Sequence, residues 1–152
     1  MPMTLEQLRS QLSAIEPDER MYQGIGPSEI PLLEQLLQDE EPWMASRAVF
    51  ALSRIPHPEA MRILSQVTAD PRPEVRVSLA ASARNMPPQA ASDILLNLLD
   101  DADVGVRKFS VDSIAPVHNK AVHAKLKEIE GQDPSPAIRK MARTRMEELD
   151  DK

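Results

Sequence analysis

Residues 70–76 read DPRPEVR, and this short stretch decides the fold because it returns at a fixed distance along the chain. The chain reads DADVGVR at 101–107 and DPSPAIR at 133–139, so each copy opens with Asp and closes with an aliphatic residue and Arg. A fourth Asp precedes these copies, although Ala45 stands where the others have Arg. The four aspartates, separated by 31, 31 and 32 residues, are Asp39, Asp70, Asp101 and Asp133. A period of this length predicts a chain built from repeated structural units.

The residues on either side of each Asp follow the period of an α-helix. After Asp70, the apolar residues Val75, Leu79 and Ala83 are spaced by four, which places them on one helical face. Before it, Leu64 and Val67 are spaced by three. Each unit is therefore expected to contain two helices. We expect first helices near 28–38, 59–69, 89–99 and 120–130, and second helices near 43–55, 74–86, 104–116 and 136–149.

Prolines support these boundaries, because Pro is tolerated in the first turn of a helix and costly in its interior. Pro42, Pro73 and Pro136 stand where second helices should begin. One further amphipathic helix is predicted at 4–15, with Thr4 as its N-cap. We expect a single domain over 1–152: an N-terminal capping helix and link at 1–26, then repeats at 27–56, 57–87, 88–118 and 119–149.

A two-helix unit with this Asp-Pro turn resembles the HEAT repeat family, most closely the short HEAT-like repeats of the phycobilisome lyase type. The resemblance covers residues 28–149 and is weakest in the first unit. It implies an all-α fold, an α-solenoid wound as a right-handed superhelix of about four repeats, with the second helices on the concave side. In such a fold, the recurring Asp can accept bonds from N–H groups of the next helix, and the recurring Arg can reach a carboxylate or a carbonyl.

Composition narrows the classes of function. The chain of 152 residues has a net charge of −6 and no Cys, which excludes disulfides and thiol chemistry. Residues 1–46 carry −7 and residues 47–152 carry +1, so no strongly basic surface suggests nucleic acid. No apolar run is long enough to span a membrane, and we expect a cytoplasmic protein without a membrane partner.

No group of residues in the sequence has the spacing of a catalytic site. The three histidines, His57, His118 and His123, lie in links or at a helix start, and their spacing completes no metal site. The GIG at 24–26 lacks the third glycine that dinucleotide binding would need. We predict no catalytic residue, no cofactor and no metal.

A row of residues on the second helices varies between units and is a candidate surface for a partner. Its first members, Trp43, Arg47, Phe50 and Arg54, are spaced by four, three and four on one stripe. Trp and Arg are enriched at binding hot spots, which favours binding for the two arginines. For Trp43 and Phe50 a second role stays open, namely burial beneath helix 4–15. The predicted partner-binding residues are Trp43, Arg47, Phe50, Arg54, Ser78, Asn85, Phe109 and Asp112.

These observations favour a non-catalytic adaptor, a monomer that binds a partner protein or peptide on its concave face. The resemblance also implies an alternative function, as a subunit of a bilin lyase or a chaperone-like factor for a chromophore-bearing protein. A nucleic-acid-binding helical-repeat protein is the third hypothesis, and steep salt dependence of DNA binding would favour it.

Overall fold

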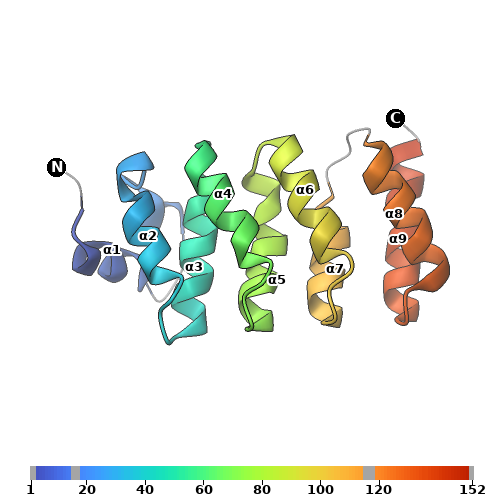
Figure 1. Cartoon of the computed structure of the whole chain (residues 1–152), viewed down its shortest axis with the longest axis horizontal. Coiled ribbons are helices and arrows are strands. Elements are labelled where there is room, and N and C mark those ends of the chain that lie inside the picture. Colours follow the sequence, from blue (N-terminus) through green and yellow to red (C-terminus); the bar gives the residue numbers. More distant parts are fainter. Residues whose placement is uncertain (1–2, 15–17, 115–118, 151–152) are drawn as a thin grey trace. The chain divides into compact units, whose positions relative to one another are not determined.

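The computed structural model describes residues 3–14, 18–114 and 119–150. It divides the chain into two compact units, Met1–Leu79 and Ala80–Lys152, which we call unit 1 and unit 2 and describe separately. All regular elements in the described residues are helices (Figure 1). None of them combines the length and the apolar composition that a membrane span requires.

Unit 1 is built around α3, which contacts α1, α2 and α4. Its elements in chain order are α1 (Leu5–Leu12), the short 3-10 helices η1 (Glu19–Tyr22) and η2 (Pro27–Glu29), α2 (Ile30–Leu36), α3 (Pro42–Ser53), α4 (Pro58–Val67) and the first part of α5 (Pro73–Ser82). In α1, Thr4 accepts a hydrogen bond from the Gln7 N–H, while the Gln7 side chain accepts one from the Thr4 N–H. The predicted N-cap is thus confirmed.

Unit 2 repeats the pairing of antiparallel helices. It contains the end of α5, η3 (Ala83–Asn85), α6 (Pro88–Leu98), α7 (Val104–Asp112), α8 (Lys120–Gln132) and α9 (Pro136–Asp150). Within it, α6 contacts α7 and α8, and α9 contacts α7 and α8. Figure 1 shows α8 and α9 side by side at the C-terminal end of the chain.

The core follows the register that the sequence predicts. The aliphatic residue that precedes the motif Arg is buried in every repeat. The four residues, each at most 1% exposed, are Met44, Val75, Val106 and Ile138. The first helices contribute Leu33, Leu64, Leu95 and Leu126, each at most 2% exposed. Met146 in α9, the counterpart of Ala83 in the last repeat, is only partly buried, whereas the repeat pattern predicts a core position.

Several predicted helices extend further toward the C-terminus than the observed helices. The expected helix at 74–86 ends as an α-helix at Ser82 and continues as the 3-10 turn η3. The expected helix at 104–116 ends at Asp112, and its last two predicted residues lie outside the described part of the chain. The capping helix, expected at 4–15, ends at Leu12.

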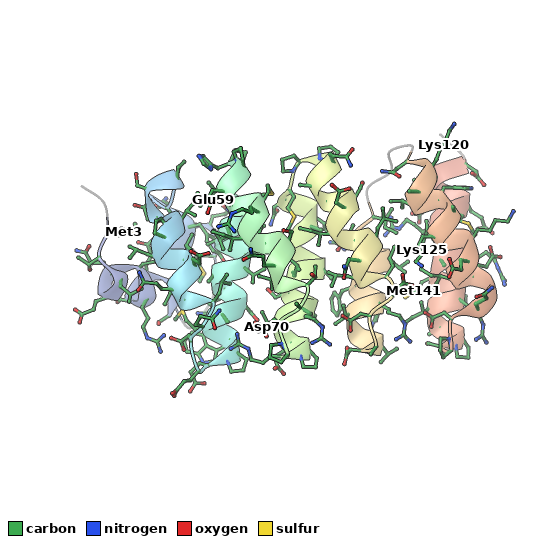
Figure 2. The ribbon with its side chains drawn as sticks, viewed as in Figure 1. Met3, Glu59, Asp70, Lys120, Lys125 and Met141 are labelled. Carbon is green, nitrogen blue, oxygen red and sulfur yellow. The ribbon has the colours of Figure 1, made fainter. Side chains whose placement is uncertain are left out.

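The recurring Asp forms a turn before each second helix. Each carboxylate accepts a hydrogen bond at 2.9 Å from the backbone N–H two residues later, as Asp70 does from Arg72. Figure 2 labels Asp70 in the link between α4 and α5. The four donors are the N–H groups of Glu41, Arg72, Asp103 and Ser135. The N–H that is bonded precedes the helix, so the motif fixes the entry of the chain into the helix rather than capping its first turn.

The recurring Arg closes the same turn from the other side. Arg76 donates to the Asp70 carbonyl oxygen at 2.7 Å, and Arg139 donates to the Asp133 carbonyl oxygen at 2.6 Å. Arg107 donates to the Asp101 carbonyl oxygen at 2.9 Å and also reaches the Asp133 carboxylate of the next repeat at 2.9 Å. The motif therefore stabilises both the turn and, at Arg107, the junction between neighbouring repeats.

Candidate partner-binding groove

A groove of about 960 Å³ lies in unit 1, where the start of α3 faces η1 and the start of α5. We call it the Trp43 groove. Its lining combines aromatic rings with carboxylates: Asp18, Glu19, Tyr22, Pro42, Trp43, Ser46, Arg47, Phe50, Glu74 and Ser78. Three separate stretches of sequence supply these side chains, and the fold of unit 1 brings them together.

Trp43 lies in the first turn of α3, and its residue surface is 44% exposed. The guanidinium of Arg47, one turn later, lies 5.1 Å from the centre of the Trp43 ring system. Burial of Trp43 beneath helix 4–15 is therefore wrong. An exposed indole on a groove is a large apolar surface available to a partner.

Phe50 continues the groove two turns further along α3 and is half-buried. Its ring centre lies 4.9 Å from that of Tyr22 in η1, at an interplanar angle of 46°. The Arg54 guanidinium lies 5.0 Å from the Tyr22 ring and 5.9 Å from the Phe50 ring. Phe50 thus contacts the N-terminal segment through Tyr22 of η1.

The same two arginines hold the N-terminal segment on α3. Arg47 donates to the carbonyl oxygens of Leu12 at 2.6 Å and Ala14 at 2.7 Å, at the carboxyl end of α1. Arg54 donates to both carboxylate oxygens of Glu19, at 2.8 and 2.6 Å. These contacts give Arg47 and Arg54 a structural role, since η1 forms one wall of the groove.

The carboxylates of η1 are charged at neutral pH. The hydrogen bond from Arg54 lowers the pKa of Glu19 below its ordinary value of 4.5. The side chain and backbone N–H of Arg20 lower the pKa of Asp18 below 3.8. Burial raises the pKa of Tyr22 above 10, so its phenol is neutral. The groove therefore pairs a neutral aromatic floor with an anionic rim.

The eight predicted partner-binding residues fall into two groups. Trp43, Arg47, Phe50 and Ser78 line the groove, and Arg54 reaches it through Glu19. The Ser78 hydroxyl donates to the Ser46 carbonyl oxygen at 3.0 Å, which links α5 to α3. The three others, Asn85, Phe109 and Asp112, belong to unit 2.

In unit 2 the predicted residues differ in their surroundings. Phe109 on α7 is 38% exposed. The Asp112 carboxylate forms ion pairs with Arg84 and with Arg145. Asp112 therefore already holds α7 against η3 and α9, whereas the Phe109 ring remains accessible.

Reasoning from the repeat missed six residues that line the groove: Asp18, Glu19, Tyr22, Pro42, Ser46 and Glu74. The first three lie before the repeats, where no period can align them with other residues. Glu74 occupies the position in the second repeat that Trp43 holds in the first. The single Tyr of the chain within a charged stretch, DERMY at 18–22, was the one available signal.

Two of the three histidines, His57 and His123, lie in the described part of the chain. The His57 Nδ1 accepts a hydrogen bond from the Glu59 N–H at 3.1 Å and so caps α4. His123 lies in α8, and His118 is outside the described residues. Across the described ranges, no three His, Asp or Glu side chains gather closely enough to hold a metal ion.

The comparison with known families decides the relationship. A family model described as HEAT repeats matches residues 29–115, more than half of the chain. The chain belongs to the HEAT repeat family. The HEAT match begins in η2 and ends beyond α7, so it includes α3 and α5 of the groove but not η1. No curated protein matches the sequence.

Solved structures show the same fold. A chain in the complex of CpcE and CpcF of phycocyanin lyase from Nostoc sp. PCC7120 is 19% identical, with a TM-score of 0.71, and the match covers 93% of this chain and 96% of that one. A designed armadillo repeat protein in complex with the peptide (KR)4 is 18% identical, with a TM-score of 0.56 and coverages of 95% and 81%. At this identity the likeness shows the fold alone, an all-α repeat solenoid of HEAT repeats.

Proposed function

We propose that this HEAT repeat chain is a non-catalytic adaptor that holds a segment of a partner protein in the Trp43 groove. One observation carries the proposal: Trp43 is 44% exposed on a groove whose wall is supplied by the chain's own N-terminal segment. An apolar surface of this kind costs solubility in a free protein, and a partner that covers it gains the burial of the indole.

The solved relatives support the proposal at the level of architecture. One relative is a chain of the complex of CpcE and CpcF, and the other is a designed repeat protein in complex with a peptide. Both structures are therefore complexes with another chain. In unit 2, the accessible ring of Phe109 is a separate candidate contact for a partner, together with Asn85 and Asp112.

Affinity purification from the native source, followed by mass spectrometry, tests the adaptor function. Wild-type protein should retain one or a few proteins in defined stoichiometry, and Trp43→Ala should lose them while its helical content and melting temperature stay close to wild type. Val104→Ala is the matched control, because it truncates an exposed apolar side chain that does not line the groove. Equal retention by wild type and Trp43→Ala would contradict the assignment of the groove.

A second function, a subunit of a bilin lyase, is favoured by the likeness to the phycocyanin lyase chain over 96% of its length. In that case the purification should return a second lyase subunit together with bilin absorbance. Retention of colourless partners alone, from a source that makes bilins, would favour the general adaptor.

A further inference from the structure

The charge of the molecule is concentrated in the unit that contains the groove. Residues 1–79 hold twelve acidic and seven basic residues, a net charge of −5, whereas residues 80–152 hold twelve and eleven, a net charge of −1. All seven cations of unit 1 are arginines, and the first lysine of the chain is Lys108. Unit 1 is therefore expected to attract a cationic partner.

The arginines of unit 1 are already engaged by unit 1 itself. Their partners are carboxylates or carbonyl oxygens: Arg9 with Asp39, Arg20 with Asp18, Arg47 with Leu12 and Ala14, Arg54 with Glu19, Arg62 with Glu34 and Glu59, Arg72 with Asp70, and Arg76 with the Asp70 carbonyl. None is therefore presented to a partner as a ready anion-binding group. The unit's positive charge stabilises its own fold.

Unmatched negative charge remains at the Trp43 end of the groove. Glu74 is exposed, lines the groove from the start of α5 and forms no ion pair within the described residues. Glu40 and Glu41 are exposed, likewise unpaired in the described part of unit 1, and directly precede Pro42, which lines the groove. A cation placed here meets carboxylates that form no ion pair with the described residues.

The aromatic floor is arranged for apolar contact rather than for binding a cation. The Arg47 guanidinium lies against the Trp43 ring, and the Arg54 guanidinium lies close to both Tyr22 and Phe50. These ring surfaces therefore already have cation–π partners from the chain itself. A cation of a partner is left to pair with the carboxylates, while the remaining aromatic surface suits an apolar side chain.

We propose that the segment bound in the Trp43 groove is basic and amphipathic. An apolar side chain rests on Trp43 and Phe50, and a neighbouring Lys or Arg pairs with Glu74 and the Glu40–Glu41 carboxylates. This inference rests on the proposed function and adds to it the chemistry of the partner. It distinguishes the groove from a general hydrophobic surface, because an acidic segment of equal hydrophobicity is repelled.

Synthetic peptides test the inference without knowledge of the partner. Four peptides of equal length are compared: a Leu pair flanked by Lys, the same pair flanked by Glu, the same pair flanked by Ser, and a Lys-flanked peptide with Ser in place of Leu. Binding is measured by calorimetry and by the emission of Trp43, the single tryptophan. The Lys-flanked Leu peptide should bind about tenfold more tightly than the Ser-flanked one and lose affinity as salt is raised.

Charge-removing variants locate the cation. Glu74→Gln should weaken the Lys-flanked Leu peptide about threefold, and the triple change Glu40→Gln, Glu41→Gln, Glu74→Gln about tenfold, with no loss for the Ser-flanked peptide. Glu147→Gln is the matched control, since Glu147 is an exposed glutamate on α9 in unit 2. Circular dichroism melts establish that each variant is folded.

The results of these experiments distinguish a failure of the basic-segment proposal from a failure of the adaptor function on which it rests. If the Glu-flanked peptide binds as well as the Lys-flanked one, or if the triple variant binds the Lys-flanked peptide like wild type, the basic assignment is overturned. The groove would still stand as a docking site if Trp43→Ala loses a purified partner. If no peptide binds at about 1 mM, the inference also fails.

Discussion

At the scale of the single residue, the ring of Trp43 contacts the cation of Arg47 and is also exposed to solvent. Its 44% exposure and its position beside Arg47 follow from the helical spacing of four residues in α3. We expect red-shifted emission that acrylamide quenches readily, since water reaches the indole. Blue emission resistant to quencher would contradict an open groove. Phe109→Ala, which leaves the tryptophan untouched, should give the same spectrum.

Arg47 is the residue that ties the N-terminal segment to α3. Arg47→Ala removes two hydrogen bonds from a charged donor and should lower the free energy of unfolding by about 2 kcal/mol. Hydrogen exchange should increase in residues 5–12, because α1 loses its attachment. Arg62→Ala is the control, since its side chain is 52% exposed and its ion pairs are at the surface. A protected α1 in Arg47→Ala would show that other contacts hold it.

At the scale of the element, the sequence predicted the core far better than the helix ends. Val75 and Leu64 could be assigned to the core because the equivalent position is apolar in all four repeats. Helix ends depend on local conformations, such as η3, that the repeat does not share. The groove was only half predicted: α3 supplied Trp43 and Phe50, but its opposite wall comes from η1, outside the repeats.

The Asp turn before α5 should make stability depend on pH. Burial raises the pKa of Asp70, but hydrogen bonds from the side chain and backbone of Arg72 outweigh it, so the pKa lies below its ordinary value of 3.8. Because the pKa of Asp70 is lower in the folded chain than in the unfolded chain, the unfolded chain takes up the proton at a higher pH. The contribution of the Asp70 carboxylate to the free energy of unfolding is therefore present above about pH 4. It is lost as the pH falls through the pKa of Asp70 in the folded chain.

Asp70→Asn should flatten this acid dependence in melts recorded between about pH 2 and pH 7. The amide oxygen can still accept the Arg72 N–H, so the turn itself is kept. Asp93→Asn, at an exposed position on α6, is the control. An unchanged acid profile in Asp70→Asn would mean that other carboxylates dominate.

The junction of α7 with the turn before α9 depends on one buried ion pair. The side chains of Arg107 and Asp133 are 12% and 3% exposed. Arg107→Ala leaves the Asp133 carboxylate buried without its cation and should cost about 3–5 kcal/mol of unfolding free energy in urea melts. Adding Asp133→Asn should recover part of the loss. The surface change Arg143→Ala, at 61% exposure, should cost far less.

At the scale of the whole molecule, the repeats share apolar layers in which a single charge cannot be accommodated. Leu79 is fully buried and Ile114 is 4% exposed. Leu79→Asp or Ile114→Asp should abolish cooperative thermal unfolding as followed by circular dichroism, because an unpaired carboxylate would lie in the core. Ser65→Asp on the exposed face of α4 should melt like wild type. A sharp transition in either core variant would contradict the register.

The lysine-free composition of residues 1–79 has a practical consequence for how this molecule can be handled. Reagents that acylate side-chain amines can modify only residues from Lys108 onward, and Lys108, Lys120, Lys127 and Lys140 are exposed. Immobilisation on a biosensor through these amines attaches the protein by unit 2. Fluorophores and crosslinkers of the same chemistry likewise leave every side chain around Trp43 unmodified, so the groove can be studied in its native chemical state.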